Sequence, residues 1–267
     1  TVTVSYSGGT TIEQDDETPE IQKAKLTITA DSATKTYDGT ELTDDGWEDT
    51  EPDGLIGEDE VESVTVTGSQ TLVGSSKNTF TYTLNEGTKA DNYTIPKTEG
   101  TLTVTELTDK VTVTITEHSG SYKYDGGEKS VTGYDVTSIS NSLYTEADFT
   151  FSGNDSVSGT DAGSYDMKLS ADDFTNTSSN FSNVEFVIVD GTLEISKRTV
   201  TLTSADDEKV YDGTALTNDE VTVGGDGFAT GEGATYDVTG TQTEKGSSAN
   251  AFTYTLNDGT KADNYTI

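Results

Sequence analysis

The sequence predicts an all-β protein of tandem small β-sandwich domains, Ig-like or open-barrel, with repeats of about 87 residues that form an elongated rod. Three observations support this. A Tyr-Asp-Gly motif recurs with its tyrosines at positions 37, 124 and 211, and such a fixed period indicates a repeat architecture. Apolar residues alternate with threonine in many short runs, as in strands with one buried face. The 267 residues include 51 Thr, 13 Tyr and 27 Gly but only 3 Pro, which favours short strands and tight turns.

The first and third copies also match after the Tyr-Asp-Gly motif. Residues 80–85 (Phe-Thr-Tyr-Thr-Leu-Asn) recur at 252–257. Residues 87–95 (Gly-Thr-Lys-Ala-Asp-Asn-Tyr-Thr-Ile) recur at 259–267. These matches place the two copies in one register.

The middle copy is more diverged but keeps the same landmarks. It has Asp-Ala-Gly-Ser-Tyr at 161–165, and Asn180-Phe181 stands in place of Asn-Tyr. It closes with Gly-Thr-Leu-Glu-Ile-Ser at 191–196, much as the first copy closes with Gly-Thr-Leu-Thr-Val-Thr at 100–105.

The alternating segments are the expected strands of the sheets. One face is apolar and the other carries threonine, which is typical of antiparallel sheets with one buried and one solvent-exposed face. In Tyr-Asp-Gly, the aspartate can bond to its own backbone and the glycine accepts positive φ, so we expect a turn there. No amphipathic helix is indicated. The expected strands include residues 26–28, 64–66, 80–84, 102–104, 111–115 and 200–202.

The register divides the chain into four segments. Residues 1–24 are expected to hold the closing strand of a preceding repeat and an acidic linker. Residues 25–107 form the first repeat and residues 108–197 the diverged second one. Residues 198–267 form a third repeat whose last strand is missing. Because the joints are short, we expect a fairly stiff rod.

The composition excludes several classes of function. The 15 Lys and Arg oppose 49 Asp and Glu, so the net charge is −34, and such a surface does not attract nucleic acid or anionic membranes. The chain has no Cys and one His, which excludes disulfides, thiolate nucleophiles and multi-histidine metal sites. No apolar run of about 18 residues is present, so we expect no membrane insertion in this segment.

Taken together, the motifs resemble the MBG/YDG-type repeats of large bacterial cell-surface proteins and adhesins. They are Tyr-Asp-Gly-Thr, Ala-Gly-x-Tyr, Asn-Tyr-x-Ile and Gly-Thr-Leu-x-Ile/Val, and the likeness covers residues 25–267. The second copy departs from the pattern, with Gly127-Glu128 after its Tyr-Asp-Gly and no full Asn-Tyr-Thr-Ile. The resemblance implies an extracellular, multi-copy, all-β stalk, often in proteins anchored to the envelope, and it names no ligand.

The residues that recur in these motifs are expected to be structural rather than catalytic. A tyrosine at a fixed place in three diverging copies is best explained by packing, so we expect each Tyr-Asp-Gly ring to be substantially buried. The motif residues are Tyr37, Asp38, Gly39, Tyr124, Asp125, Gly126, Tyr211, Asp212, Gly213, Asn92, Tyr93, Asn264 and Tyr265.

An acidic loop in the first copy imitates a calcium loop. Carboxylates at Asp49, Glu51, Asp53 and Glu60 fall at positions 1, 3, 5 and 12, with glycine at position 6. Against calcium, position 3 is Glu, a proline stiffens the loop, and no helices flank it. The alternative is a structural turn, shared with residues 226–232 of the third copy, that is acidic here. No other cofactor is expected.

Signals for catalysis are weak. His118 is a single histidine near a turn, which is usual for a surface residue, and carboxylate pairs are inevitable among 49 acids. Trp47 could stack on a sugar or close the end of a small core. We therefore expect no enzyme.

Covalent cross-links between side chains are a further hypothesis. A Lys–Asn isopeptide needs a buried lysine, an asparagine and a carboxylate. Lys25 opens a strand, but the third copy has Thr199 there. Gln70 and Gln242 are equivalent and could accept an ester from a threonine.

The two ends of the sequence suggest strand exchange. Residues 1–6 (Thr-Val-Thr-Val-Ser-Tyr) alternate like a closing strand, whereas the third copy has no such strand after its Asn-Tyr element. We hypothesise that residues 1–6 pair with a neighbouring molecule's third copy or with an edge of this chain.

The function predicted is a non-catalytic structural stalk or spacer of a bacterial extracellular surface protein, which displays a binding region away from the cell. One alternative is a self-assembling extracellular fibre or surface-layer subunit that uses strand addition between copies. The other is a glycan- or protein-binding adhesion module. The expected partners are neighbouring repeats and further copies of the chain, and the sequence names no host or cell-surface ligand.

Overall fold

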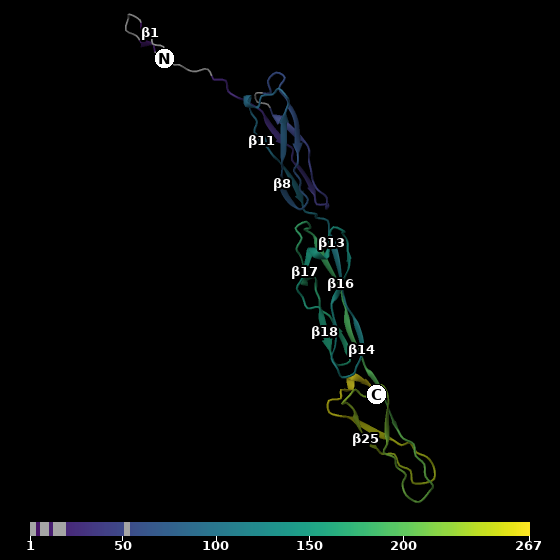
Figure 1. Ribbon diagram of the computed structural model, residues 1–267. Coiled ribbons are helices and arrows are strands. Elements are labelled where there is room, and N and C mark those ends of the chain that lie inside the picture. The colour runs from purple at the N-terminus through teal and green to yellow at the C-terminus, as the bar shows by residue number, and fades with distance from the viewer. Residues whose placement is uncertain (1–3, 6–10, 13–19, 51–53) are drawn as a thin grey trace. The chain divides into compact units, whose positions relative to one another are not determined.

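The computed structural model describes residues 4–5, 11–12, 20–50 and 54–267 (Figure 1). Their regular structure consists of strands and short 3-10 helices, so the predicted all-β class is confirmed. The chain divides into two compact units. The first contains the chain up to Thr108 together with Ser179–Ser182, and the second contains Asp109–Ser178 and Asn183–Ile267. Among the described residues, no helix is long and apolar enough to cross a membrane.

The first repeat is built from small sheets. In one sheet the closing strand β12 lies between β5, which is parallel to it, and β8, which is antiparallel. The other sheets are β11-β4-β6, β7-β9 and β10-β3. The elements are β3 (Ala24–Lys25), β4 (Thr27–Ala30), β5 (Ala33–Thr36), β6 (Trp47–Thr50), β7 (Val61–Val66), β8 (Gly74–Asn78), β9 (Phe80–Leu84), η1 (Ala90–Asn92), β10 (Tyr93–Thr94), β11 (Lys97–Thr98) and β12 (Gly100–Thr105).

The second repeat has an equivalent closing strand. Here β22 lies between the parallel β14 and the antiparallel β19, and a second sheet has the order β16-β13-β21. The pairs β15-β18 and β17-β20 complete it. The elements are β13 (Val111–Glu117), β14 (Gly120–Lys123), β15 (Lys129–Thr132), β16 (Tyr134–Ile139), η2 (Glu146–Asp148), β17 (Phe149–Phe151), β18 (Ser156–Gly159), β19 (Gly163–Asp166), η3 (Ala171–Asp173), β20 (Phe174–Asn176), β21 (Val184–Val189) and β22 (Thr192–Ser196).

The third repeat has fewer strands. Its sheets are β24-β23-β27 and β25-β26. Its described residues include no counterpart of the three-stranded sheet that holds β12 or β22 in the other repeats. The elements are β23 (Arg198–Ser204), β24 (Val221–Gly225), β25 (Ala234–Val238), β26 (Phe252–Leu256), η4 (Ala262–Asn264) and β27 (Tyr265–Thr266).

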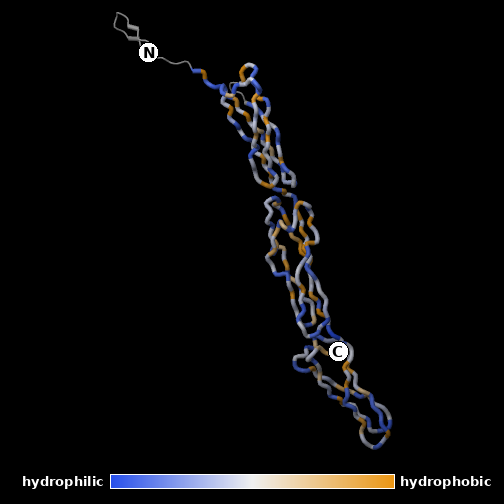
Figure 2. Tube along the Cα trace, in the orientation of Figure 1, coloured by the Kyte–Doolittle hydropathy of each residue, from blue (hydrophilic) through white to orange (hydrophobic). Residues whose placement is uncertain are grey.

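The core follows the alternation in the sequence. Along β13, Val111, Val113 and Ile115 are buried while the threonines between them are only half-buried. Figure 2 shows this pattern as short apolar stretches separated by hydrophilic ones along each repeat. Each small core is therefore made by the apolar half of its strands.

One strand carries a buried charge on the same face. Glu117 follows the apolar residues of β13 and is 3% exposed. Its carboxylate accepts hydrogen bonds from the backbone N–H groups of Leu169, at 2.7 Å, and Gly191, at 2.6 Å. These two donors compensate the burial of the carboxylate and tie a loop and the residue just before β22 to β13.

Near the start of the chain, β1 (Val4–Ser5) pairs antiparallel with β2 (Thr11–Ile12). Within the described residues, this segment therefore pairs locally rather than with the third repeat. Residues 1–3 and 6, which belong to the same strand-exchange hypothesis, lie outside the described residues.

Candidate functional site: the tyrosine joints

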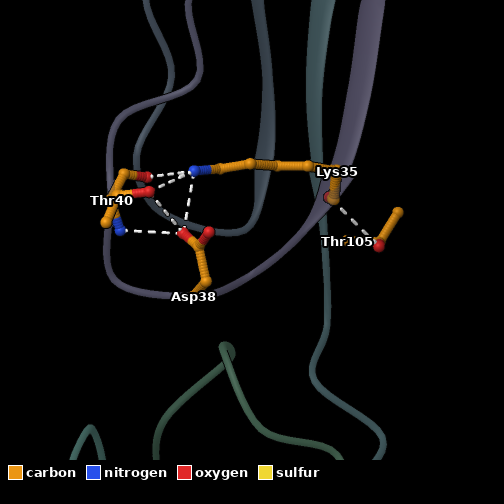
Figure 3. Close-up of polar contacts among 4 residues, drawn as sticks. All are labelled: Lys35, Asp38, Thr40 and Thr105. Carbon is orange, nitrogen blue, oxygen red and sulfur yellow. Dashed lines mark hydrogen bonds and ion pairs between the residues drawn. The ribbon is translucent and has the colours of Figure 1, made fainter.

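The Asp-Gly part of the first motif forms a local turn, held by contacts of Asp38 with Lys35 and Thr40 (Figure 3). Asp38 Oδ1 accepts a hydrogen bond from Thr40 N at 2.9 Å and forms an ion pair with Lys35 Nζ at 2.8 Å. The hydrogen bonds from Lys35 and Thr40 hold the pKa of Asp38 well below its usual range. Gly39 has φ 78°, a conformation that favours glycine.

The same turn recurs in the other two copies. Asp125 Oδ1 accepts from Gly127 N, and Asp212 Oδ1 accepts from Thr214 N, both at 2.9 Å. Hydrogen bonds from the Thr214 side chain and backbone lower the pKa of Asp212 to about 2. The two motif glycines, Gly126 and Gly213, have φ 84° and 77°. The turn is thus independent of what surrounds it.

Burial of the motif tyrosines differs between copies. Tyr124 is 4% exposed and Tyr37 is half-buried, but Tyr211 is 64% exposed. The expectation that every such ring is buried is therefore wrong for Tyr211. The physical reason is that the ring is covered by an aromatic residue of the following copy, and Tyr211 has no such residue against it among the described residues.

In the second unit, Tyr124 packs edge-on against Tyr265 of the third repeat. The ring centroids are 5.6 Å apart and the rings are inclined at 84°, an arrangement favoured by aromatic quadrupoles. Both hydroxyls donate to the carboxylate of Glu232, that of Tyr265 at 2.7 Å. Burial, and then the bond to Glu232, raises the pKa of Tyr124 to about 12.

An asparagine completes the contact beside the rings. Asn264 is fully buried, and its Oδ1 accepts a hydrogen bond from Ala162 N at 2.7 Å. Its Nδ2 donates to Asp161 Oδ1 at 3.0 Å, and Lys261 pairs with Asp161 at 2.6 Å. The Asn-Tyr motif of the third repeat is therefore held by the Asp-Ala-Gly loop of the second.

The linker between these repeats is also fixed. Arg198 donates from Nε to Gly227 O at 2.9 Å and from Nη1 to Tyr124 O at 3.3 Å. Lys123 forms an ion pair with Asp226 at 2.7 Å, and the other oxygen of Asp226 accepts from Thr199 N at 3.0 Å. Charged and backbone groups from both repeats thus meet at the linker that joins the second repeat to the third.

The first unit contains a matching arrangement. Tyr37 packs edge-on against Phe181, with centroids 5.6 Å apart and an angle of 80°. Asn180 Oδ1 accepts from Val73 N at 3.0 Å, as Asn264 does from Ala162. Both residues belong to Ser179–Ser182, the segment of the second copy that packs within the first unit. We call each set, a motif tyrosine with the next copy's Asn-aromatic pair, a tyrosine joint.

The acidic loop of the first copy supports an equivalent tyrosine. Tyr93 OH accepts from Ile56 N at 3.0 Å and donates to Asp59 at 2.6 Å. In the third copy, Tyr265 OH accepts from Ala229 N at 2.9 Å and donates to Glu232. The structure therefore supports the reading of this loop as a shared structural turn, anchored by the tyrosine of the Asn-Tyr motif.

The calcium hypothesis falls partly outside the described residues, since Glu51 and Asp53 are not among them. Asp49 lies in β6, opposite Ile28 of β4. Glu60 accepts a weak hydrogen bond from Asn85 Nδ2 at 3.5 Å. The described part of the chain holds no group of three or more acidic or histidine side chains that could bind a metal. Calcium binding by this loop stays a prediction.

The other candidate residues have structural contacts. His118 Nδ1 lies 2.8 Å from Thr132 O and its Nε2 lies 3.3 Å from Asp135. These contacts, the first above all, raise the pKa of His118. Trp47 is 38% exposed on β6. The Gln70 and Gln242 amides each donate to the carbonyl two residues on, at 2.7 and 2.6 Å. Lys25 lies on β3 beside β10.

Sequence reasoning did not find the groups that complete the second unit's joint. These are Glu232, Asp161, Asp226 and Arg198. One signal was present in the sequence: Glu232 occupies in the third copy the place of Asp59 in the first, so an acid opposite the Asn-Tyr motif recurs. The others could not be found, because their partners lie in another repeat.

Comparisons with known proteins place two family domains in this chain. The model of the YDG domain matches residues 21–101, and the model of the MBG domain matches residues 111–197. No curated protein and no solved structure matches the chain.

Proposed function

Because the chain carries a YDG domain and an MBG domain in tandem, a β-rich repeat module, we propose that it is a non-catalytic spacer of a bacterial extracellular surface protein or adhesin. Its role is mechanical: it holds a binding region away from the cell. The partners in this role are its own neighbouring repeats.

The observation that carries this proposal is the repeated tyrosine joint. A spacer transmits position only if each repeat is fixed to the next, because a flexible link lets the far end collapse back. In the second unit the joint combines a buried ring pair, a buried asparagine and a fixed linker arginine. In the second unit, residues that recur between copies thus hold the third repeat against the second, which supports a spacer role.

Charge and composition support the same role. A net charge of −34 disfavours association between separate copies of the chain and with anionic surfaces. The chain also has no cysteine, so its stability does not depend on the redox state of its surroundings. Both features suit a segment exposed outside the cell.

Small-angle scattering of the full chain tests the proposal. A compact protein of this length has a radius of gyration of about 18 Å, and we expect a clearly larger value. We also expect Tyr124→Ala with Asn264→Ala to broaden the distribution of interatomic distances, since it opens the joint of the second unit. The matched control is Tyr211→Ala with Asn92→Ala, which changes the same residue types at exposed positions.

Two results would contradict the spacer. One is a radius of gyration near about 18 Å for the unaltered chain. The other is a distance distribution that the joint variant and the control change equally, with hydrogen exchange showing that β13 is still folded in both.

A further inference from the structure

The strand β21 lies at an edge of the second repeat. It pairs parallel with β13 along its whole length, and within the described part of the chain no other strand pairs with it. Asn183 O accepts a hydrogen bond from Val111 N at 2.9 Å, which fixes the backbone groups that face β13. Because successive residues of a strand turn these groups to opposite edges, the N–H and C=O groups of Val184, Phe186 and Ile188 point away from β13. They form the outward edge of the sheet.

This edge strand is apolar on both of its faces. Val184, Phe186 and Ile188 are half-buried on the side of the core. On the opposite face, Val187 is 39% exposed and Val189 is 46% exposed. Valine, isoleucine and phenylalanine are strong strand formers, and a long apolar edge strand of this kind is a template for pairing with another chain.

The equivalent edge of the first repeat is protected. There β11 pairs parallel with β4 as β21 pairs parallel with β13, so β11 is the counterpart of β21. It is only two residues long, begins with a lysine and follows a proline. Short strands, proline and lysine are the usual means by which proteins keep an edge from pairing. In the same register, the second repeat has residues 187–189 (Val-Ile-Val) in place of residues 96–98 (Pro-Lys-Thr), so it lacks this protection.

The charges around the strand indicate what kind of partner fits. Glu185 lies on the face of the exposed valines, where it pairs with Lys110 at 2.5 Å, and its side chain is 49% exposed. Asp190 directly follows the strand and Asp172 belongs to η3, which lies beside β21, and both are exposed. These carboxylates favour cationic side chains on the partner. A second copy of the chain would bring acid against acid, because each copy carries a net charge of −34.

We propose that β21 is a docking edge for one extended, basic segment of a separate protein. The segment adds as an antiparallel strand, and its backbone exchanges hydrogen bonds with the outward groups of β21. At alternate positions it places two apolar side chains opposite Val189 and Val187 and then a lysine or arginine opposite Glu185. This binding role goes beyond the spacer role and does not depend on it.

A synthetic peptide, Lys-Val-Thr-Val-Thr-Lys with both ends blocked, tests the proposal on the full chain. Its two valines and its last lysine have the spacing required to face the two exposed valines and the glutamate of β21. At saturating peptide we expect at least about tenfold slower hydrogen exchange of the amides of Val184, Phe186 and Ile188. A peptide with glutamate in place of both lysines is expected to give no protection.

A variant of the chain tests the apolar contacts. Val187→Thr with Val189→Thr removes one methyl group from each contact and should weaken binding of the lysine peptide about tenfold. The matched control is Val223→Thr, because Val223 is 44% exposed on β24, an edge strand of the third repeat. It should leave binding unchanged. Protection of the β13 amides shows that the second repeat is folded in each variant.

Without peptide, the unaltered chain is expected to sediment as a monomer whose outward β21 amides exchange fast. The proposal is overturned if the lysine peptide does not slow these amides or if the glutamate peptide slows them equally. It is also overturned if the double variant and the Val223→Thr control bind the peptide alike. A dimer of the chain alone that protects the same amides would overturn it as well, since a second copy would then be the occupant.

Discussion

Replacing Tyr124 by alanine removes the central ring of the joint in the second unit. The ring is 4% exposed and packs on Tyr265, so its loss leaves a cavity between two repeats. Truncating a buried aromatic ring costs about 3–5 kcal/mol. The hydroxyl contributes little beyond this, because the carboxylate of Glu232 keeps the donor from Tyr265.

The magnitude can be checked inside the same chain. For a unit of this size, a loss of about 4 kcal/mol lowers Tm by roughly 8–16 °C. Tyr211→Ala changes the same motif where the ring is 64% exposed, so it should stay within about 0.5 kcal/mol. Because Tyr37 is half-buried, the stability loss caused by Tyr37→Ala should lie between those of Tyr124→Ala and Tyr211→Ala. Tyr124→Phe keeps the ring and should cost only about 1 kcal/mol.

The assay is thermal unfolding followed by calorimetry, with hydrogen exchange to show which unit loses protection. Tyr124→Ala should lower the transition of the second unit and leave the first unit unchanged. If Tyr211→Ala destabilises the chain as much as Tyr124→Ala does, the tyrosine acts within its own repeat. The motif ring would then have no special part in coupling one repeat to the next.

Three other predictions concern neighbouring groups. Asn264→Ala should cost about 1–3 kcal/mol in denaturant unfolding, since it removes a fully buried side chain that bonds to Ala162 N and Asp161, whereas Asn92→Ala, at the exposed equivalent, should cost under about 0.5 kcal/mol. Gly191→Ala should destabilise the chain by about 1–3 kcal/mol, because the new Cβ would lie 2.2 Å from a backbone oxygen. Gly163→Ala should not destabilise it in this way, because the nearest atom to its Cβ would be 3.8 Å away. The pKa of Tyr124 is raised to about 12 in the folded chain, so its contribution to the free energy of unfolding is fully present below pH 10. The free energy of unfolding should therefore fall as the pH rises from 10 to 12. The fall should be smaller in Tyr124→Phe.

The strands could be predicted from the sequence because their signal is local. Alternation with period two is written within a few residues, as in Val111–Glu117, and the structure has a strand there. Pairing partners carry no such signal. The parallel contact of β12 with β5 joins Leu102 to Ala33 across most of a repeat. Only the fold brings these residues together.

Burial of the motif tyrosines shows the same limit more sharply. Tyr37, Tyr124 and Tyr211 sit in nearly identical local sequences, yet one is buried, one half-buried and one exposed. What differs is the residue supplied by the next copy. Glu117 is a second case: it reads as the polar end of a strand, but its carboxylate is buried by donors from residues 169 and 191.

The Tyr-Asp-Gly motif therefore combines two separable roles. Asp212 and Gly213 form their turn in the third repeat even though the ring beside them is exposed, so the turn does not need the ring. The ring, in turn, is ordered against a neighbour only where an Asn-aromatic pair meets it, as at Tyr124. If packing inside one repeat were the reason for the tyrosine, the ring would be buried in all three copies. Its recurrence is better explained by the contact that the motif tyrosine makes with the Asn-aromatic pair of the next copy.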